Sequence, residues 1–221
     1  MIIAIDGPAA SGKSTTAKIV AEKLGFTYLD TGAMYRCVTL AMINAGIHVS
    51  NTEQINDLLE NISIDLRDKN GKLQIMMNNL DVSDDIRSGK VTENVSAVSA
   101  LKNVREAMVK MQRNISSKTD CVMEGRDIGT VVFPNAEYKF YLSADSAVRA
   151  ERRQRDLLAL GEEKSIQELK EDIIRRDEYD SSREISPLKK AEDAIDINTT
   201  NLTIDGQVSK IIEIVNKQKT K

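Results

Sequence analysis

The amino-acid sequence predicts an α/β fold in which a parallel sheet is flanked by helices, with a small antiparallel β insertion and a helical lid. Three observations predict it. The chain opens with a short apolar run at residues 2–6, a glycine-rich loop and a helix, and a second strand and helix follow at once. Residues 62–66 alternate between apolar and polar, as strands of an antiparallel sheet do. Two highly charged helical segments, about 146–160 and 165–180, are poor in apolar residues, which suits a solvated lid better than a core.

The strand–helix units follow one another along the chain. The first helix ends at Gly25, residues 26–30 form the second strand, and the next helix begins at Thr31. This order predicts parallel pairing of the strands. The later elements are helical segments up to residue 117, buried strands at 121–123 and 138–142, the two charged helices on either side of Gly161, a strand at 194–197 and a closing amphipathic helix at 205–215.

The antiparallel insertion covers roughly residues 60–85. Residues 69–71 (KNG) are predicted to form a hairpin turn between strands at 62–66 and 72–76. Residues 80–82 can add a third strand.

Length and composition exclude several classes of protein. The 221 residues fit one α/β domain with an inserted subdomain, so we expect a single domain over 1–221. Hydrophobic residues make up 41% and charged residues 29%, which argues against disorder. The net charge of −3 gives no general attraction to nucleic acid or to an anionic membrane. The chain has only Cys37, Cys121 and His48 for zinc binding or histidine-dependent hydrolysis, and we expect neither.

The same features predict where the protein works. The first residues contain no basic leader, and no apolar run approaches the roughly 18 residues that a membrane-spanning helix needs. Two cysteines cannot build a disulfide framework, which favours a reducing compartment. We therefore expect a cytoplasmic protein, and a monomer because no long heptad pattern is present.

Residues 7–14 (GPAASGKS) match the phosphate-binding pattern G-x-x-x-x-G-K-S between a buried strand and a helix start. The glycines let backbone N–H groups converge on phosphate oxygens, the lysine adds a positive charge, and the serine hydroxyl is a magnesium ligand. The pattern predicts a P-loop NTPase-type sheet and a nucleoside triphosphate site, but kinases, GTPases and ATPases share it. The predicted ATP-binding residues in this loop are Gly7, Pro8, Ala9, Ala10, Ser11, Gly12, Lys13, Ser14 and Thr15.

Arginines follow two other predicted strands. Arg36 and Arg126 both come after the carboxyl ends of strands, where open α/β sheets bind ligands. On the charged helices, Arg149, Arg152 and Arg153 share one face, and Arg176, Asp180 and Arg183 share another. Periodicity alone favours a solvated face with ion pairs. Phosphoryl transfer, however, needs several cations and a lid that excludes water, and an arginine-rich helical pair provides both.

Four segments closely resemble the bacterial cytidylate kinases, a family of nucleoside monophosphate kinases. They are the phosphate loop, residues 30–36 (DTGAMYR), residues 125–134 (GRDIGTVVFP), and residues 176–183 (RDEYDSSR) with 186–188 (SPL). The resemblance runs over nearly the whole chain. It implies a monophosphate-binding insertion at about 37–100 and an arginine-rich lid at about 146–183.

The resemblance also implies a role for individual residues. The cytosine pocket would be lined by Thr31, Ser96, Arg105 and Asp127. The acceptor phosphate would be bound by Arg36, Arg126 and Arg183. The sugar would be contacted by Arg176 and Asp180. Arg153, with Arg149 or Arg152, would be the lid cation on the donor phosphates. The expected catalytic residues are Lys13, Arg126, Arg153 and Arg183, with magnesium at Ser14 and at Glu124 either directly or through water.

The sequence thus predicts a magnesium-dependent transfer of the γ-phosphate of ATP to CMP or dCMP, with small-molecule nucleotides as partners and neither nucleic acid nor membrane. One alternative is a kinase for another nucleoside monophosphate or a small hydroxy acid. An alternative of another class is a nucleotide-dependent switch or nucleic-acid-binding ATPase. The eight aromatic residues (5 Tyr, 3 Phe, no Trp) and the negative net charge disfavour a nucleic-acid binder.

Overall fold

The structure, a computed structural model, describes residues 1–69, 72–159 and 161–219. The chain divides into two compact units. One consists of Met1–Leu29 and Lys118–Lys221 and is called the sheet unit here, and the other, Asp30–Ser117, is called the inserted unit. None of the helices in the described ranges combines the length and the hydrophobicity that a membrane crossing requires.

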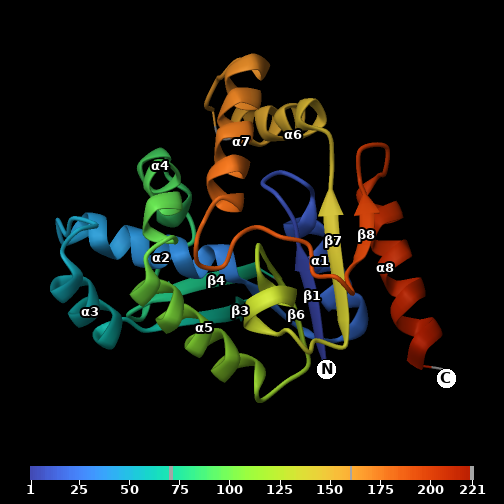
Figure 1. Ribbon diagram of the computed structural model, residues 1–221, viewed down its shortest axis with the longest axis horizontal. Helices are drawn as coiled ribbons and strands as arrows, with labels where there is room; N and C mark the ends of the chain where they lie inside the picture. The colour runs from blue at the N-terminus through green and yellow to red at the C-terminus, as the bar shows by residue number, and fades with distance from the viewer. Residues whose placement is uncertain (70–71, 160, 220–221) are drawn as a thin grey trace. The chain divides into compact units, whose positions relative to one another are not determined.

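The sheet unit is built on a five-stranded sheet with the order β2-β6-β1-β7-β8. β1 pairs in parallel with β6 and with β7, and β7 pairs in parallel with β8, which confirms the predicted fold class (Figure 1). The elements are β1 (Ile2–Asp6), α1 (Lys13–Leu24), β2 (Thr27–Asp30), β6 (Cys121–Gly125), the short π-helix η2 (Ile128–Val132), β7 (Tyr138–Ser143), α6 (Ser146–Leu158), α7 (Ile166–Ser181), β8 (Ile195–Asn198) and α8 (Ile204–Lys219).

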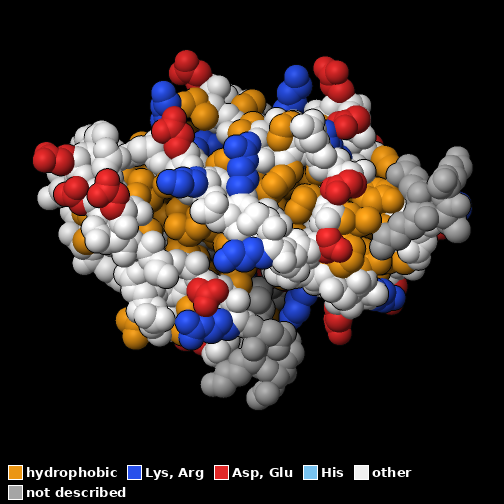
Figure 2. Space-filling view, turned by 90° about the horizontal axis from the view of Figure 1, so that it is seen from below, with side chains coloured by type: hydrophobic (Ala, Val, Ile, Leu, Met, Phe, Trp, Pro, Cys, Tyr) orange, Lys and Arg blue, Asp and Glu red, His pale blue; other side chains and the backbone are white. Residues whose placement is uncertain are grey.

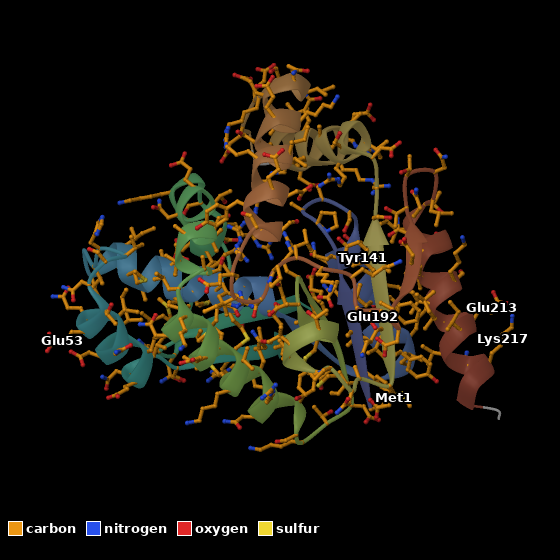
Figure 3. The ribbon with its side chains drawn as sticks, viewed as in Figure 1. Met1, Glu53, Tyr141, Glu192, Glu213 and Lys217 are labelled. Carbon is orange, nitrogen blue, oxygen red and sulfur yellow. The ribbon has the colours of Figure 1, made fainter. Side chains whose placement is uncertain are left out.

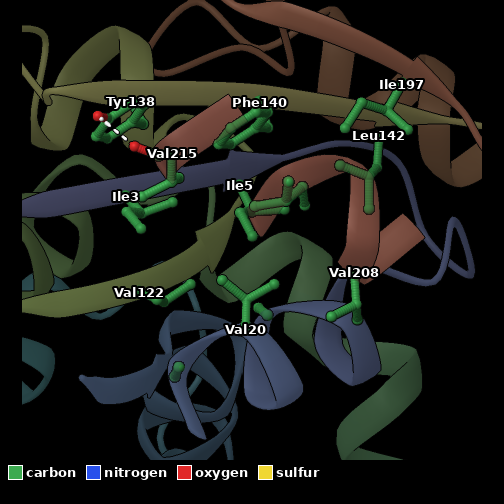
Figure 4. Packing of buried hydrophobic residues seen from close by; sticks show 13 residues of the cluster. Ile3, Ile5, Val20, Val122, Tyr138, Phe140, Leu142, Ile197, Val208 and Val215 are labelled. Atoms are coloured by element: carbon green, nitrogen blue, oxygen red, sulfur yellow. Dashed lines mark hydrogen bonds between the residues drawn. The ribbon is translucent and has the colours of Figure 1, made fainter. Parts of the chain in front are cut away.

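The main core lies between this sheet and the helices α1 and α8. Ile3 and Ile5 of β1, with Phe140 and Leu142 of β7, are at most 1% exposed and pack against these two helices (Figure 4). Central parallel strands are covered on both faces, which is why their sequences are almost continuously apolar. The core therefore fixes the carboxyl end of β1, from which the phosphate loop leaves.

The charged helices α6 and α7 have a small apolar core of their own. A small cluster of their apolar residues is buried between them, namely Ala150, Leu157, Leu169 and Ile173. A capping box of Ser165 and Glu168 starts α7. These few apolar residues lie on the facing sides of the two helices, so a low overall apolar content still leaves enough for a local core.

The inserted unit combines helices with the predicted antiparallel sheet. Its elements are α2 (Thr31–Asn44), α3 (Thr52–Asn61), β3 (Ile64–Lys69), β4 (Lys72–Met77), β5 (Leu80–Asp81), the 3₁₀ helix η1 (Asp85–Arg87), α4 (Gly89–Val98) and α5 (Lys102–Ser116). The strand order is β3-β4-β5, and both pairings are antiparallel. Asn70 and Gly71 of the predicted hairpin turn lie outside the described residues.

Candidate functional site

The phosphate loop has the backbone conformation that gathers N–H groups. Gly7 has φ 153°, and a Cβ there would lie 2.2 Å from the carbonyl oxygen of Leu142, so only glycine fits. Ala10 and Gly12 have left-handed φ values of 56° and 91°. Left-handed residues alternating with right-handed ones turn successive N–H groups toward one point and form an anion-binding nest. The loop then enters α1, whose N-terminus adds the positive end of the helix dipole.

The lysine of the loop is folded onto the loop itself. The side chain of Lys13 is buried, and its Nζ donates to the carbonyl oxygen of Pro8 at 2.9 Å. A charge held here is partly desolvated, so it acts more strongly on a nearby phosphate than a charge in water would.

A hydroxyl and a carboxylate meet at the start of α1. Ser14 Oγ donates to Glu124 Oε2 at 2.7 Å, and the phenol of Tyr28 donates to Glu124 Oε1. Glu124, the penultimate residue of β6, is 3% exposed. Both Ser14 and Glu124 offer oxygen ligands, which magnesium prefers. Within the described ranges no group of three or more His, Cys, Asp or Glu residues could hold a metal, so magnesium here would depend on substrate phosphates and water for its remaining ligands.

Two adjacent backbone amides hold a second buried carboxylate. The N–H groups of Ile128 and Gly129 donate to Asp6 at 2.9 and 2.8 Å. Burial raises the pKa of Asp6 to about 6, although these two hydrogen bonds lower it. The contacts fix the start of η2 immediately after Asp127, which is 3% exposed. Sequence patterns did not predict this π-helix.

Two of the predicted phosphate-binding arginines share one anion. Asp180 on α7 accepts from Arg126 Nε at 3.0 Å and contacts Arg183 through its other oxygen. Arg176 is partly buried on the same helix. Arg126 and Arg183, 57 positions apart in the sequence, thus lie around one carboxylate.

The three arginines on α6 have different surroundings. Arg149 pairs with Asp177 at 2.6 Å and donates to the carbonyl oxygen of Ala9 at 3.2 Å. Arg152 donates to Thr199 and, at 3.4 Å, to the carbonyl oxygen of Ser11. Arg153 is partly buried and makes no side-chain hydrogen bond or ion pair with the described residues. Arg149 and Arg152 therefore hold the protein's own backbone, and Arg153 differs from them in this respect.

In the inserted unit, α2 begins at the predicted ligand edge. The carboxylate of Asp30 caps the helix by accepting from the N–H of Ala33 at 2.9 Å, which leaves Thr31 as the first helical residue. Arg36 lies in the second turn, where its Nη1 donates to the carbonyl oxygen of Ile86 and to Thr92 Oγ1, both at 3.0 Å. These contacts orient the guanidinium.

Arg105 is the second cation of the inserted unit. It is 3% exposed, donates to the carbonyl oxygen of Ser99 at 3.0 Å, and lies over the ring of Tyr35 at 5.2 Å from the centroid. Ser96 is partly buried on α4, and its carbonyl oxygen accepts from Ser99 Oγ at 3.1 Å. The structure thus brings Ser96 and Arg105 together through Ser99.

Several residues of the sheet unit that lie near the phosphate loop or near charged site residues were missed by sequence reasoning. Thr199 and Gln207 are both fully buried, and they contact Ser11 and Thr16 respectively. Tyr141 lies on β7 (Figure 3), and burial followed by the charge of Asp177 raises its pKa. A signal for Thr199 was present, because it follows the carboxyl end of a parallel strand, as the predicted site residues do.

Comparison with known proteins decides the family. A family model described as cytidylate kinase matches residues 3–217. The cytidylate kinase of Lactobacillus johnsonii is 49% identical over 99% of this chain and 95% of its own length. That of Carboxydothermus hydrogenoformans is 48% identical over 99% and 98% of the two chains. This chain belongs to the cytidylate kinase family. It is therefore a nucleoside monophosphate kinase by family, as the sequence motifs predicted.

Solved structures show the same fold at low sequence identity. An uncharacterized protein from Eubacterium ventriosum has a TM-score of 0.54 at 13% identity, covering 98% of both chains. A shikimate kinase from Bacteroides thetaiotaomicron has a TM-score of 0.51 at 15% identity, also covering 98% of both. Similarity at these identities demonstrates the fold alone.

Proposed function

We propose that this member of the cytidylate kinase family transfers the γ-phosphate of ATP to CMP or dCMP, giving ADP and CDP or dCDP. The observation that carries the proposal is the near full-length similarity to cytidylate kinases, at 46–49% identity in eight relatives. The nest-like phosphate loop supports a nucleoside triphosphate as donor. We further propose a monomer in the cytoplasm, in keeping with the composition.

For the donor, we assign residues 7–15 to the ATP phosphates. The N–H groups of the loop bind oxygens, and Lys13 can exchange its contact with Pro8 for one with phosphate. Arg153 is the proposed lid cation, since its two neighbours on α6 already hold backbone carbonyls. Ser14 would hold magnesium, with Glu124 directly or through water. When bound, the metal neutralises charge on the phosphate oxygens.

For the acceptor, we assign Arg126 and Arg183 to the phosphate, together with Arg36. Two arginines around Asp180 offer several N–H donors with fixed orientation, which suits a phosphate. Arg176 and Asp180 are assigned to the sugar. The base contacts are assigned to Thr31, Ser96, Arg105 and Asp127.

The proposed chemistry needs no covalent intermediate and no strong base. Positioning and neutralisation of charge supply most of the rate enhancement in phosphoryl transfer. Lys13, Arg126, Arg153 and Arg183 are the proposed catalytic cations. This division of labour agrees with a chain that contains one histidine.

An acceptor panel tests the proposal. With ATP and magnesium, kcat/KM is measured for CMP, dCMP, UMP, AMP, GMP and shikimate. We expect CMP and dCMP to exceed every other acceptor by at least about tenfold. A higher value for any other acceptor would identify a different kinase.

The distribution of surface charge bears on the nucleic-acid alternative. On the face shown in Figure 2, Lys and Arg side chains are interspersed with Asp and Glu, whereas a nucleic-acid binder typically gathers positive charge along one stripe. ATP hydrolysis that rises on adding RNA or DNA, without any acceptor, would favour that alternative.

A further inference from the structure

The outward carbonyl groups of the phosphate loop are bonded by side chains from other parts of the sheet unit. The carbonyl oxygen of Ala9 accepts from Arg149 on α6. The carbonyl oxygen of Ser11 accepts from Thr199 Oγ1 at 2.9 Å, and Arg152 Nη1 lies 3.4 Å from it. Thr199 follows β8, 188 positions after Ser11.

The hydroxyl of Thr199 links Arg152 to the loop. Arg152 Nη1 donates to Thr199 Oγ1 at 3.1 Å, and its Nη2 donates to the carbonyl oxygen of Thr199 at 2.7 Å. The carbonyl oxygen of Ser143 lies 3.0 Å from the same hydroxyl, but it already accepts the backbone N–H of Thr199 at 2.7 Å. The hydroxyl has one proton to donate, and the Ser11 carbonyl oxygen, at 2.9 Å, is the nearer of its two possible acceptors. Thr199 is 0% exposed, so no solvent competes for this proton.

Fixing a carbonyl fixes the next amide. In a trans peptide the C=O of residue 11 and the N–H of residue 12 point in opposite directions. Gly12 has φ 91° and no side chain, so the peptide before it could rotate at little steric cost. The bond from Thr199 to the Ser11 carbonyl oxygen therefore selects the rotation in which the Gly12 N–H points away from Thr199.

The other side of Gly12 is closed by Gln207 of α8. A Cβ at Gly12 would lie 2.9 Å from Gln207 Oε1, and this oxygen accepts from Thr16 Oγ1 at 2.7 Å. Gln207 is 0% exposed and keeps its amide beside the glycine. The Ser11–Gly12 peptide is thus held at its carbonyl oxygen by the Thr199 hydroxyl and packed against Gln207.

We propose that Thr199 is a positioning residue of the phosphate loop. Its hydroxyl, supported by Arg152, holds the Ser11–Gly12 peptide so that the Gly12 N–H is directed at the phosphates of the donor nucleotide. Thr199 is not one of the residues assigned above to ATP, CMP or magnesium. The inference rests on the proposed function, because it takes the loop to bind ATP and ADP.

Three variants separate positioning from general stability. Thr199→Val removes the hydroxyl with little change in shape, and Thr199→Ser keeps it. Tyr138→Phe is the matched control, because it removes the bond from the Tyr138 hydroxyl to the carbonyl oxygen of Val215, 3.1 Å long, in the core away from the phosphate loop (Figure 4). For each variant, the Kd of ADP is measured by calorimetry, with the KM values of ATP and CMP, kcat and the melting temperature.

We expect Thr199→Val to raise the Kd of ADP and the KM of ATP by about two- to tenfold, the range for one net hydrogen bond. The KM of CMP should stay within about twofold of the wild-type value, and Thr199→Ser should bind ADP nearly as the wild type does. Tyr138→Phe should lower the melting temperature and leave the Kd of ADP unchanged.

Wild-type ADP affinity in Thr199→Val would overturn the inference, as would equal losses of affinity in all three variants. If Thr199→Val does not fold, Thr199→Cys replaces it, because a thiol is a weak donor of similar size. A Kd equal in the Cys and Ser variants would then overturn the inference. Failure of the wild type to bind ADP would instead contradict the proposed function.

Discussion

The carboxylate of Asp180, 2% exposed, accepts a hydrogen bond from Arg126 Nε at 3.0 Å. Its second oxygen contacts Arg183, whose side chain is 7% exposed. One buried anion therefore neutralises and orients two cations assigned to the acceptor phosphate. Removing one member of a buried ion pair leaves an uncompensated charge, which typically costs 3–5 kcal/mol.

Asp180→Asn should consequently reduce both stability and activity. We expect the free energy of unfolding to fall by about 3 kcal/mol and kcat/KM for CMP to fall at least about tenfold because the arginines lose their orientation. Asp172→Asn is the control, since Asp172 is 41% exposed and pairs with the exposed Arg175, a kind of pair worth less than about 1 kcal/mol. Equal effects in urea unfolding of the two variants would contradict this account.

Lys13→Ala should nearly abolish phosphoryl transfer and leave the fold intact. The substitution removes a positive charge at the donor phosphates and leaves the apolar core unchanged, so we expect kcat/KM to fall at least about a hundredfold. Lys18, exposed on the same helix, provides the control Lys18→Ala, which should keep full activity. Circular dichroism checks the fold. Unchanged turnover in Lys13→Ala would remove the basis for assigning the loop to ATP.

Asp127 is the proposed reader of the cytosine amino group. An ionised carboxylate attracts the N4 donor of cytosine and repels the O4 acceptor of uracil. Asp127→Asn should lower kcat/KM for CMP and narrow the gap to UMP, because an amide N–H can turn toward O4. Asp127→Ala should lower the value for CMP without helping UMP. If the ratio of kcat/KM for CMP to kcat/KM for UMP is the same in Asp127→Asn as in the wild type, Asp127 does not read the base and has another role, such as orienting Arg126.

Asp6 should make stability depend on pH in a predictable direction. Its pKa rises from 3.8 to about 6 on folding, so between these values the folded state binds more protons than the unfolded state. The contribution of Asp6 is thus present below pH 4 and is lost as the pH rises through 6, by up to about 3 kcal/mol at 1.36 kcal/mol per pKa unit. The unfolding free energy of the wild type minus that of Asp6→Asn should therefore fall, by up to about 3 kcal/mol, between pH 4 and pH 7. A difference that is constant with pH would contradict the shift.

The helices α6 and α7 should close when substrates bind. If Arg153 and its neighbours form a lid, backbone amides of these helices should exchange more slowly with solvent when both ADP and CMP are present. Hydrogen exchange read by mass spectrometry checks this. The same exchange rate with and without nucleotides would indicate that these arginines form a solvent-exposed helix face and not a lid.

The central strands β1 and β6 were predictable because burial on both faces leaves a plain signature in the sequence. All five residues of β6 are buried, and in β1 only Ile2 is partly exposed, so each is a short run of apolar residues ending in polar ones. The phosphate loop was equally clear, since its glycines, lysine and serine follow one fixed spacing within residues 7–14. Both the central strands and the phosphate loop can therefore be recognised from a short stretch of consecutive residues.

The partners of the lid arginines could not be predicted in the same way. Helical spacing places Arg149, Arg152 and Arg153 on one face, but it does not distinguish a phosphate from a backbone carbonyl as the acceptor. The structure assigns Arg149 to Ala9 and Arg152 to Thr199, contacts that depend on how β8 and the loop come together. The π-helix η2 was missed for a similar reason, because its start is fixed by Asp6, more than a hundred positions earlier.

Phosphorus NMR of the purified chain with ATP, magnesium and CMP tests the central claim most directly, because it identifies every phosphorylated product. We predict that ADP and CDP appear in equal amounts, with no inorganic phosphate beyond that formed without protein, and that Lys13→Ala produces neither nucleotide. ADP and inorganic phosphate formed without CDP would contradict a cytidylate kinase and identify a nucleotide hydrolase.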